Sequence, residues 1–391
     1  MLRPWRLGPE RVVFGVVVML MVALVAAACS TEPVPTSTSD WSRVPHEEAV
    51  FGGEGHQLIV SVAAMGPLVV AVGTSGWDGE ETPAVWTSPD GITWSRVPHD
   101  EAVFGGDANE AMGGVTVGGP GFVAVGSGEV GAAVWTSSDG ITWTRVPHDD
   151  AVFGNSGMSA VTAGGPGLVA VGDDQVWTSP DGITWTRVAD VGEEFNAGAV
   201  ITGGPGLVMV GTTFSADSEG EEGSLDAIVW TSQDGITWSR VPYDEAIFGD
   251  AEMWGVTAGD SGLVAVGRGG FSGDDLDAVV WTSPDGITWS RVANDEAIFG
   301  GEGEQAMSSV TADGRGLVAV GWDEASGDNA AVWTSPNGIT WSRVPESDAA
   351  LRADNVQAMM SVTAGGPGIV AVGWTAGEPR DGAVWVEATD G

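Results

Sequence analysis

One phrase, W-T-S-P-D-G-I-T-W-S-R-V, recurs through this chain almost unchanged and constrains its fold more than any other feature. Successive copies, counted from the second tryptophan of the phrase, lie 53, 49, 42, 53, 51 and 52 residues apart. A period of this size is typical of a repeat architecture whose units each hold four short strands. These tryptophans are Trp41 (in a truncated first copy, D-W-S-R-V), Trp94, Trp143, Trp185, Trp238, Trp289 and Trp341.

Each repeat reads as four strands, which we call A to D. In the copy at 309–344, strand A ends in the turn residues A-D-G-R-G, and L-V-A-V-G (317–321) follows as strand B. A continuous apolar run of this length is expected for a strand buried on both faces. Strands C (330–334) and D (339–344) are separated by S-P-N-G, which carries the residues of a tight turn. We therefore expect each unit to be a four-stranded antiparallel blade.

The two ends of the chain decide the number of blades. The L-V-A-V-G strand, the strand C tryptophan and the strand D motif W-[ST]-R-V each occur seven times, but the first W-[ST]-R-V precedes every other element. The last repeat stops after strand C. We predict an all-β, seven-bladed β-propeller in which residues 41–44 pair with residues 383–385. This pairing completes the last blade and removes two free sheet edges.

The segment S-P-D-G-I-T-W resembles the Asp box of sialidase-like propellers, whose usual form is S-x-D-x-G-x-T-W. The copies in this chain are one residue shorter. The resemblance covers roughly residues 40–391. It implies the propeller fold, and it implies that the box is a structural turn on the face away from any ligand. The box tryptophans are expected to pack between blades. The structural Asp-box positions are Asp90, Asp139, Asp181, Asp234, Asp285 and Asn337.

The N-terminal segment has the pattern of a targeting signal. Three arginines precede an apolar stretch at 12–28, and Cys29 follows small residues. V-A-A-A-C-S resembles a bacterial lipobox, which implies cleavage before Cys29 and attachment of lipid to it. An uncleaved anchor and an ordinary signal peptide are the alternatives. We assign 1–28 to a lipoprotein-type signal peptide, 29–39 to a Ser/Thr/Pro tether and 40–391 to the propeller. All three readings place the propeller outside the cytoplasmic membrane; in the first, it is held to the lipid bilayer through Cys29.

Charge restricts the class of partner. Asp and Glu number 54, the 14 basic residues are all Arg, and the formal net charge is −40. Such a surface repels nucleic acid, so we expect no nucleic-acid partner. A solvated acidic surface suited to a salty habitat is one interpretation, and recognition of a basic partner is another. Acidic loops at 217–222 and 274–277 make Ca²⁺ a candidate, but they lack the spacing of a known calcium loop. We expect no cofactor, no metal site and a monomeric chain.

Residues present in every blade are expected to be structural. The histidines at 46, 99 and 148 share one repeat position with Tyr243 and Asn294, and this assignment leaves no lone catalytic histidine. Methionines at 112, 158, 253, 307 and 359 begin strand A and are expected to line the central channel. The strand D arginines are expected to pair with acidic neighbours: Arg43, Arg96, Arg145, Arg187, Arg240, Arg291 and Arg343.

Candidate site residues are those that break the repeat on the face carrying the D–A and B–C loops. Propeller function normally lies on such loops. Tryptophans just after strand B, beside acidic residues at 78, 80, 323 and 324, are suited to stack on sugars or hold a cationic ligand. The alternative is that each Trp covers its own blade edge. The predicted ligand-binding residues are Trp77, Trp322, Trp374, Trp254, Arg268 and Arg380, with Phe214 and Phe271 beside them.

Catalysis does not carry over from the sialidase resemblance. Sialidases use three arginines on the substrate carboxylate, a Tyr nucleophile with a Glu partner, and an acidic proton donor. The one tyrosine, Tyr243, stands at a repeat position. Outside the repeat position the arginines are Arg268, Arg315, Arg352 and Arg380, and Arg315 falls in an A–B turn on the other face. We assign no catalytic residue.

We predict a lipid-anchored, non-catalytic binding or scaffolding module for a carbohydrate or protein ligand. Two alternatives stay open. One is an extracellular carbohydrate-active enzyme, because a glycosidase built on two carboxylates cannot be placed by sequence spacing. The other is a helper in membrane-protein assembly.

Overall fold

The structure is a computed structural model. It describes residues 41–77, 79–105, 109–188, 191, 195–215, 224–270, 275–324, 329–345, 350–351, 357–366 and 368–388. The chain divides into two units, Met1–Thr38 and Ser39–Gly391, and every described residue belongs to the second. The predicted signal peptide, the tether and Cys29 therefore lie outside the described residues. No helix within those residues is long and apolar enough to cross a membrane.

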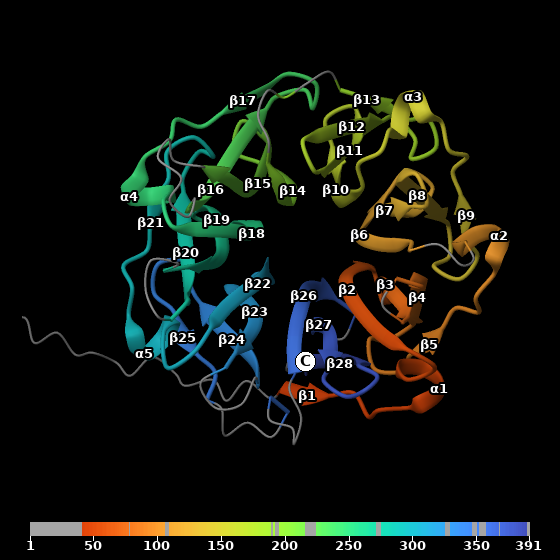
Figure 1. Ribbon diagram of the computed structural model, residues 1–391. Coiled ribbons are helices and arrows are strands. Elements are labelled where there is room, and N and C mark those ends of the chain that lie inside the picture. The colour runs from red at the N-terminus through yellow and green to blue at the C-terminus, as the bar shows by residue number, and fades with distance from the viewer. Residues whose placement is uncertain are drawn as a thin grey trace, which may run out of the picture. The chain divides into compact units, whose positions relative to one another are not determined.

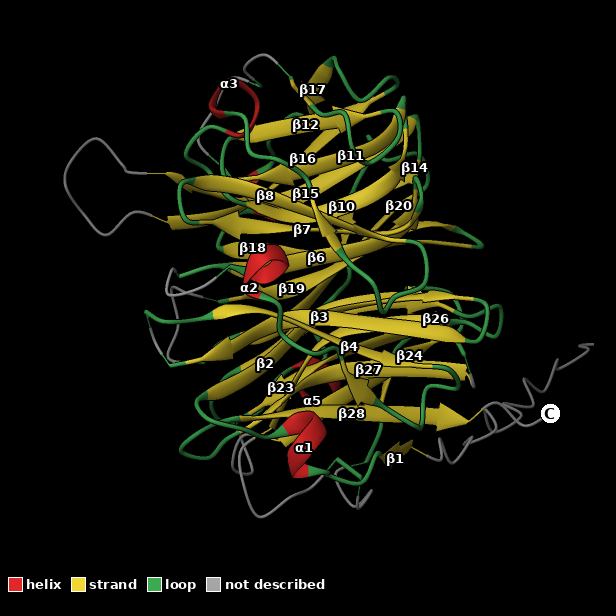
Figure 2. Ribbon diagram, turned by 90° about the vertical axis from the view of Figure 1, so that its right-hand side faces the viewer, coloured by secondary structure: helices red, strands yellow, loops and turns green. Residues whose placement is uncertain are grey.

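Seven antiparallel sheets of four strands surround a common axis in the second unit (Figure 1). We number them blade 1 (β2–β5), blade 2 (β6–β9), blade 3 (β10–β13), blade 4 (β14–β17), blade 5 (β18–β21), blade 6 (β22–β25) and blade 7 (β26–β28 with β1). Side by side, the strands run between the two faces that carry the connecting loops (Figure 2). This is the seven-bladed propeller that the repeat predicts.

The D strands have two or three residues each, whereas the A, B and C strands have five to ten. The A strands are β2 (His56–Met65), β6 (Ala111–Gly118), β10 (Met158–Gly164), β14 (Asn196–Gly203), β18 (Ala251–Gly259), β22 (Gln305–Ala312) and β26 (Gln357–Gly365). The B strands are β3 (Leu68–Gly76), β7 (Gly121–Gly128), β11 (Gly167–Gly172), β15 (Gly206–Ser215), β19 (Gly262–Gly269), β23 (Leu317–Asp323) and β27 (Gly368–Thr375). The C strands are β4 (Thr82–Ser88), β8 (Gly131–Ser137), β12 (Gln175–Ser179), β16 (Ser224–Ser232), β20 (Asp277–Ser283), β24 (Asn329–Ser335) and β28 (Asp381–Ala388). The D strands are β1 (Trp41–Arg43), β5 (Ser95–Arg96), β9 (Thr144–Arg145), β13 (Thr186–Arg187), β17 (Trp238–Arg240), β21 (Ser290–Arg291) and β25 (Ser342–Arg343).

The first strand of the chain closes the ring. β1 pairs antiparallel with β28, with Trp41 opposite Glu387 and Arg43 opposite Trp385. The backbone N–H of Val44 donates to the carbonyl of Val384 at 2.9 Å, so the pairing extends one residue beyond the strand. Trp41 is only 4% exposed and packs with residues of blades 6 and 7. The predicted closure by residues 41–44 is confirmed, although their partners are residues 384–387 rather than the predicted 383–385.

Seven hydrophobic clusters lie between neighbouring blades, and each draws its residues from two sheets. Strand B is buried on both faces, as its composition predicts; Val69 and Val70 both have no exposed surface. The box tryptophans lie in these clusters as expected: Trp94, for example, is 6% exposed between blades 7 and 1. The prediction for methionine was wrong. Met112 and Met253 are fully buried between blades rather than lining the channel, because a β-bulge after each turns the strand there.

Among the described residues, five four-residue helices, which the strand pattern did not indicate, occupy D–A connections. They are α1 (Glu48–Phe51), α2 (Glu101–Phe104), α3 (Asp150–Phe153), α4 (Glu245–Phe248) and α5 (Glu296–Phe299). The sequence signal of α2 to α5 is D-[DE]-A-[VI]-F: Asp100 caps α2 by accepting the Ala102 N–H at 3.0 Å, and the final Phe is buried. In α1 the first residue of the motif is Glu47, whose side chain makes no capping bond. The strand C tryptophan then fastens each helix, since its Nε1 donates to a helix carbonyl at 2.6–2.8 Å in these five blades.

The Asp box folds as a hydrogen-bonded turn between strands C and D. Asp90 Oδ1 accepts the N–H groups of Ile92 and Thr93 at 2.9 and 2.6 Å, and these bonds, led by that from Thr93, hold the pKa of the carboxyl below its usual value. In the other four boxes that contain Asp, the N–H groups of the equivalent Ile and Thr lower the pKa of the carboxyl in the same way. Asn337 accepts the equivalent bonds through its amide oxygen. The turn extends to the box tryptophan, so strand D is shorter than the six residues predicted.

The A–B turns of blades 2, 3, 4 and 7 lie against the Asp box of the next blade. The A–B turn of blade 6 faces blade 7, which has no Asp box. There, Arg315 in the turn of blade 6 contacts Asp313 at 2.5 Å and Glu387 of β28 at 3.5 Å. Burial raises the pKa of Glu387, and Arg315 opposes that shift. An ion pair therefore takes the place of turn–box packing at the closing blade. This explains an arginine that stands outside the repeat.

Replacing Trp41 with Ala should weaken the seam of the ring. Truncating a buried Trp typically costs about 3–5 kcal/mol, so we expect the free energy of unfolding and the melting temperature to fall together. Trp77→Ala is the matched control, because Trp77 is 47% exposed and its loss should cost less than about 1 kcal/mol. Calorimetry measures both. Equal melting temperatures for the two variants would contradict closure by β1.

Lowering the pH should remove the stabilisation that the Asp boxes provide. A lowered carboxyl pKa stabilises the fold above the unfolded value, near about 3.9, and that contribution disappears as the pH falls through the folded pKa. Asp90→Asn should therefore melt below the wild type near neutral pH, and the gap in melting temperature should close as the pH falls below the unfolded pKa and through the folded one. Asn337→Asp is the reverse control and should gain stability only at the higher pH. A gap that stays constant with pH would contradict the assignment.

Candidate functional site: two aromatic and arginine clusters on the loop face

A first cluster joins blades 5 and 6. The rings of Trp254 and Trp322 are stacked, with centroids 5.5 Å apart and planes 24° apart. The guanidinium of Arg268 lies 4.7 Å from the Trp254 centroid, and Arg268 Nε contacts Glu252 Oε2 at 2.7 Å. Glu304 Oε1 accepts from Arg268 Nη1 at 2.5 Å and from Trp322 Nε1 at 3.2 Å. Three of the predicted binding residues are therefore brought into one contact network.

A β-bulge explains how Trp254 reaches the neighbouring blade. The register of β18 and β19 shifts between Met253 and Gly255, which leaves Trp254 as the extra residue. The same bulge recurs in the other A strands, and in blades 3 and 6 its residue is Ser159 or Ser308, whose hydroxyl donates to a carbonyl of the next blade at 2.7 Å. Blade 5 thus places an indole where the neighbouring blades 4 and 6 have Gly198 and Ser308.

Arg268 is a fixed charge at the centre of this cluster. Burial alone would lower its pKa, but the hydrogen bonds and charges of Glu252 and Glu304 outweigh burial and raise the pKa above the usual value. The side chains of Glu252 and Glu304 are 13% and 20% exposed. Both carboxylates are engaged by the same guanidinium. The cluster is therefore an aromatic surface in which one guanidinium holds two carboxylates, and these three groups carry a net formal charge of −1.

A second cluster joins blades 7 and 1. Arg380 lies 4.7 Å over the ring of Trp374, and its backbone N–H donates to His56 Nδ1 at 3.0 Å. The His56 ring meets Trp77 edge to face at 5.4 Å. Trp77, Trp374 and Arg380 were predicted for the site, whereas His56 was overlooked. The histidines at 46, 99 and 148 share a repeat position, but the conclusion that no histidine stands alone left out His56, which begins strand β2 and matches no histidine in the other blades.

Two details of the predicted site need correction. Trp322 and Trp374 lie inside β23 and β27 rather than after them, because these hairpins extend two pairs beyond the strand B glycine, and both rings are half-buried. Asp323 is not a surface acid: it is buried, and it contacts Arg343 and the amide of Gln305. Glu324 does border the first cluster, where it accepts the backbone N–H of Glu304 at 3.3 Å. Asp78, Phe271 and Arg352 lie outside the described residues, and Phe214 is 64% exposed.

The sialidase residues do not assemble in the described part of the chain. Tyr243 follows β17 and is linked to Asp226 of the same blade; burial raises its pKa first, with Asp226 adding to the shift. Arg315 is held by Asp313 and Glu387. Arg268 and Arg380 belong to different clusters. Within the described ranges, no group of three or more His, Cys, Asp or Glu is arranged to hold a metal ion; the acidic loop at 217–222 and residue 274 fall outside them.

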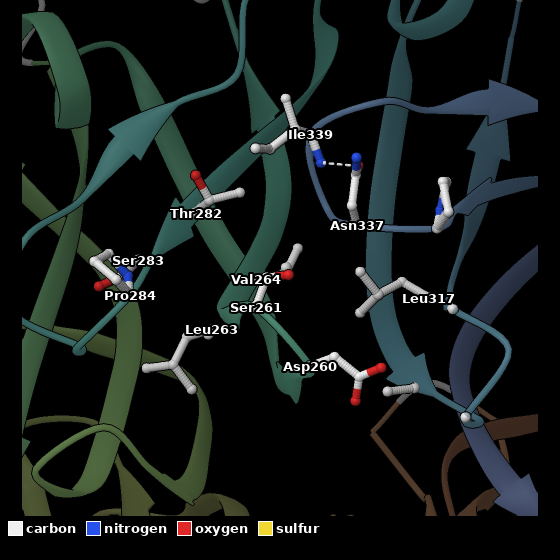
Figure 3. Close-up of a pocket in the computed structure, with 16 residues that line it drawn as sticks. Asp260, Ser261, Leu263, Val264, Thr282, Ser283, Pro284, Leu317, Asn337 and Ile339 are labelled. Carbon is white, nitrogen blue, oxygen red and sulfur yellow. Dashed lines mark hydrogen bonds between the residues drawn. The ribbon is translucent and has the colours of Figure 1, made fainter.

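The opposite face carries a cavity of about 220 Å³ between blades 5 and 6, whose lining Figure 3 shows. Its cause is local. In blade 4 the A–B turn is G-G-P-G, and Pro205 packs against Gly286 of the next Asp box. Blade 5 has G-D-S-G, so Ser261 stands where the proline ring would be. The space opens beside Asn337 and Ile339, whose hydrogen bond is drawn in Figure 3.

No family model matches the sequence, and no curated protein matches it. Among solved structures, the chain is similar to a Trypanosoma rangeli sialidase in complex with 2,3-difluorosialic acid, with a TM-score of 0.51 and 13% identity. The match covers 88% of this chain and 58% of that one. A second structure of Trypanosoma rangeli sialidase gives a TM-score of 0.50 at 12% identity, over 88% of this chain and 59% of that one.

The chain thus spans less than two thirds of the length of these sialidases, and identities of 12–13% bear on the fold alone. The seven four-stranded sheets, the ring closure and the recurring Asp boxes agree with the likeness. The chain has a sialidase-like β-propeller fold.

Proposed function

We propose that this protein is an extracytoplasmic binding module, anchored by lipid at Cys29, whose loop face binds a carbohydrate. The observation that carries the proposal is the placement of the two clusters on four consecutive blades, 5, 6, 7 and 1. Each cluster combines indole surface with a fixed arginine. Indole faces stack on the apolar faces of sugar rings, and flanking charged groups hydrogen-bond to hydroxyls.

The carboxylates of the first cluster favour a binding role over hydrolysis, because both are already held by an arginine. Glu252 and Glu304 are both engaged by Arg268, and Glu304 also accepts from Trp322. A glycosidase needs one carboxyl group as proton donor and a second as base or nucleophile, on either side of the bond that breaks. The rigid network around Arg268 instead suits recognition. A protein ligand and a role in membrane-protein assembly stay as alternatives for the same face.

Replacing Trp77, Trp322 and Trp374 together with Ala should weaken glycan binding by about tenfold or more, because three aromatic contacts are removed. A glycan array screened with the purified protein identifies the ligand, and calorimetric titration measures the affinity. Ile287→Ala is the control: Ile287 is 51% exposed on the Asp-box face. Affinity that ignores the tryptophans but falls with Asp90→Asn would move the site to that face. Hydrolysis of a sialoside that disappears in Tyr243→Phe would establish an enzyme instead.

Cys29 should be the first residue of the mature protein and should carry lipid. The basic segment, the apolar stretch and the small residues before Cys29 support this proposal. Mass spectrometry of the N-terminal peptide from the membrane fraction is the measurement. Cys29→Ser should abolish both the lipid-modified peptide and cleavage, so that the N-terminal peptide of this variant still contains the apolar stretch. A mature N-terminus at another residue, or a Cys29→Ser protein cleaved at the same position as the wild type, would contradict lipid anchoring.

A further inference from the structure

Blade 3 has the shortest B–C hairpin of the ring. Its strands β11 and β12 end at the pair Gly172–Gln175, directly at the strand B glycine. The other six blades continue past that glycine by at least two further residue pairs. In blade 2 these are Ser127–Ala132 and Gly128–Gly131. The spacing of 42 residues between Trp143 and Trp185, against 49–53 elsewhere, reflects this shortening in the sequence.

The missing pairs uncover the strand D arginine of blade 3. In blade 2 the hairpin brings Gly128 against Arg145, whose guanidinium lies 5.4 Å over Trp135 and contacts Glu110 through two bonds of 2.8 and 2.9 Å. Arg187 is exposed instead. Within the described part of the chain, it has neither a carboxylate partner nor an aromatic ring beneath it.

A cavity of about 410 Å³ takes the place of the missing hairpin end. Arg187 lines it together with Asp150 and the polar side chains of Asn155, Ser156 and Gln175. Asp150 contacts His148 Nε2 at 3.0 Å through one carboxylate oxygen and is otherwise exposed. One cavity therefore presents a guanidinium, a carboxylate and neutral hydrogen-bonding groups.

This combination selects a ligand of both charges. A guanidinium offers parallel N–H donors that match a carboxylate. Asp150 supplies a complementary acceptor for an ammonium group. A ligand with net negative charge is repelled by a chain of net charge −40, whereas a net-neutral ligand is not. We propose that the blade 3 cavity binds a small amino-acid-like zwitterion, with its carboxylate on Arg187 and its ammonium group towards Asp150. This site is separate from the loop-face clusters of blades 5, 6, 7 and 1.

Three matched probes test the charge requirement on the full chain in detergent. Glycine carries both groups, acetate lacks the ammonium, and methylammonium lacks the carboxylate. Saturation-transfer NMR titrations should show glycine binding about tenfold more tightly than either half, because each half forgoes one charge-assisted contact. Acetate binding as tightly as glycine would overturn the proposal in favour of a simple anion site. Binding of no probe would overturn it outright.

Substitutions in the blade 3 cavity test whether glycine binds there. Arg187→Gln and Asp150→Asn should each weaken glycine binding by about tenfold. Replacing 172–175 with the blade 2 segment 126–133 should refill the cavity and abolish binding, while the melting temperature shows that the ring still folds. Asp260→Asn, in an A–B turn of blade 5, is the charge-matched control and should bind glycine as the wild type does. Binding that persists in Arg187→Gln or in the refilled protein would overturn the assignment.

Discussion

The whole ring depends on the packing of one indole per blade. The strand C tryptophan is buried between sheets. In six blades its Nε1 donates to a carbonyl of the helix or loop that enters the blade, whereas Nε1 of Trp230 in blade 4 is buried with no such bond among the described residues. The strand D arginine lies over the same ring in five blades, at 5.4–5.9 Å. A single side chain thus joins the apolar core, the incoming connection and the outer strand. Because this unit repeats, loops on either face can vary without disturbing the core.

That separation explains where the unusual residues are found. Trp254 occupies a bulge position that is small in neighbouring blades, and Trp322 and Trp374 occupy corresponding pairs of two hairpins. None of them contributes to ring closure. Their arginines are held over indole rings. A surface prepared in this way binds with little loss of side-chain entropy, since the groups are already ordered by one another.

The number of blades, their four strands and the ring closure could be predicted from the repeat, and there is a physical reason for this. Interblade packing demands the same residue types at the same spacing in each unit, so Trp41 at one end and Trp385 at the other revealed the closing blade. Features that depend on one blade alone were less visible. The D-[DE]-A-[VI]-F helices are a local signal that a strand-based interpretation passed over. The burial of Met112 depends on a bulge, and that of Asp323 on a contact with Arg343. Neither follows from strand periodicity. His56 was missed because only the three histidines that share a repeat position were considered. The two cavities arise from what single blades lack: a proline in blade 5 and two residue pairs in blade 3.

Closure by the first strand also gives the ring a mechanical seam. Residue 41 follows directly on the Ser/Thr/Pro segment, so a load on the N-terminal side reaches the propeller first at β1. Only three residue pairs and the Val44 bond hold that strand to β28, whereas Trp41 is anchored in the core of blades 6 and 7. The packing of one buried indole therefore resists such a load more than the few hydrogen bonds between β1 and β28 do. The residue that completes the ring is also the one at which tension would open it.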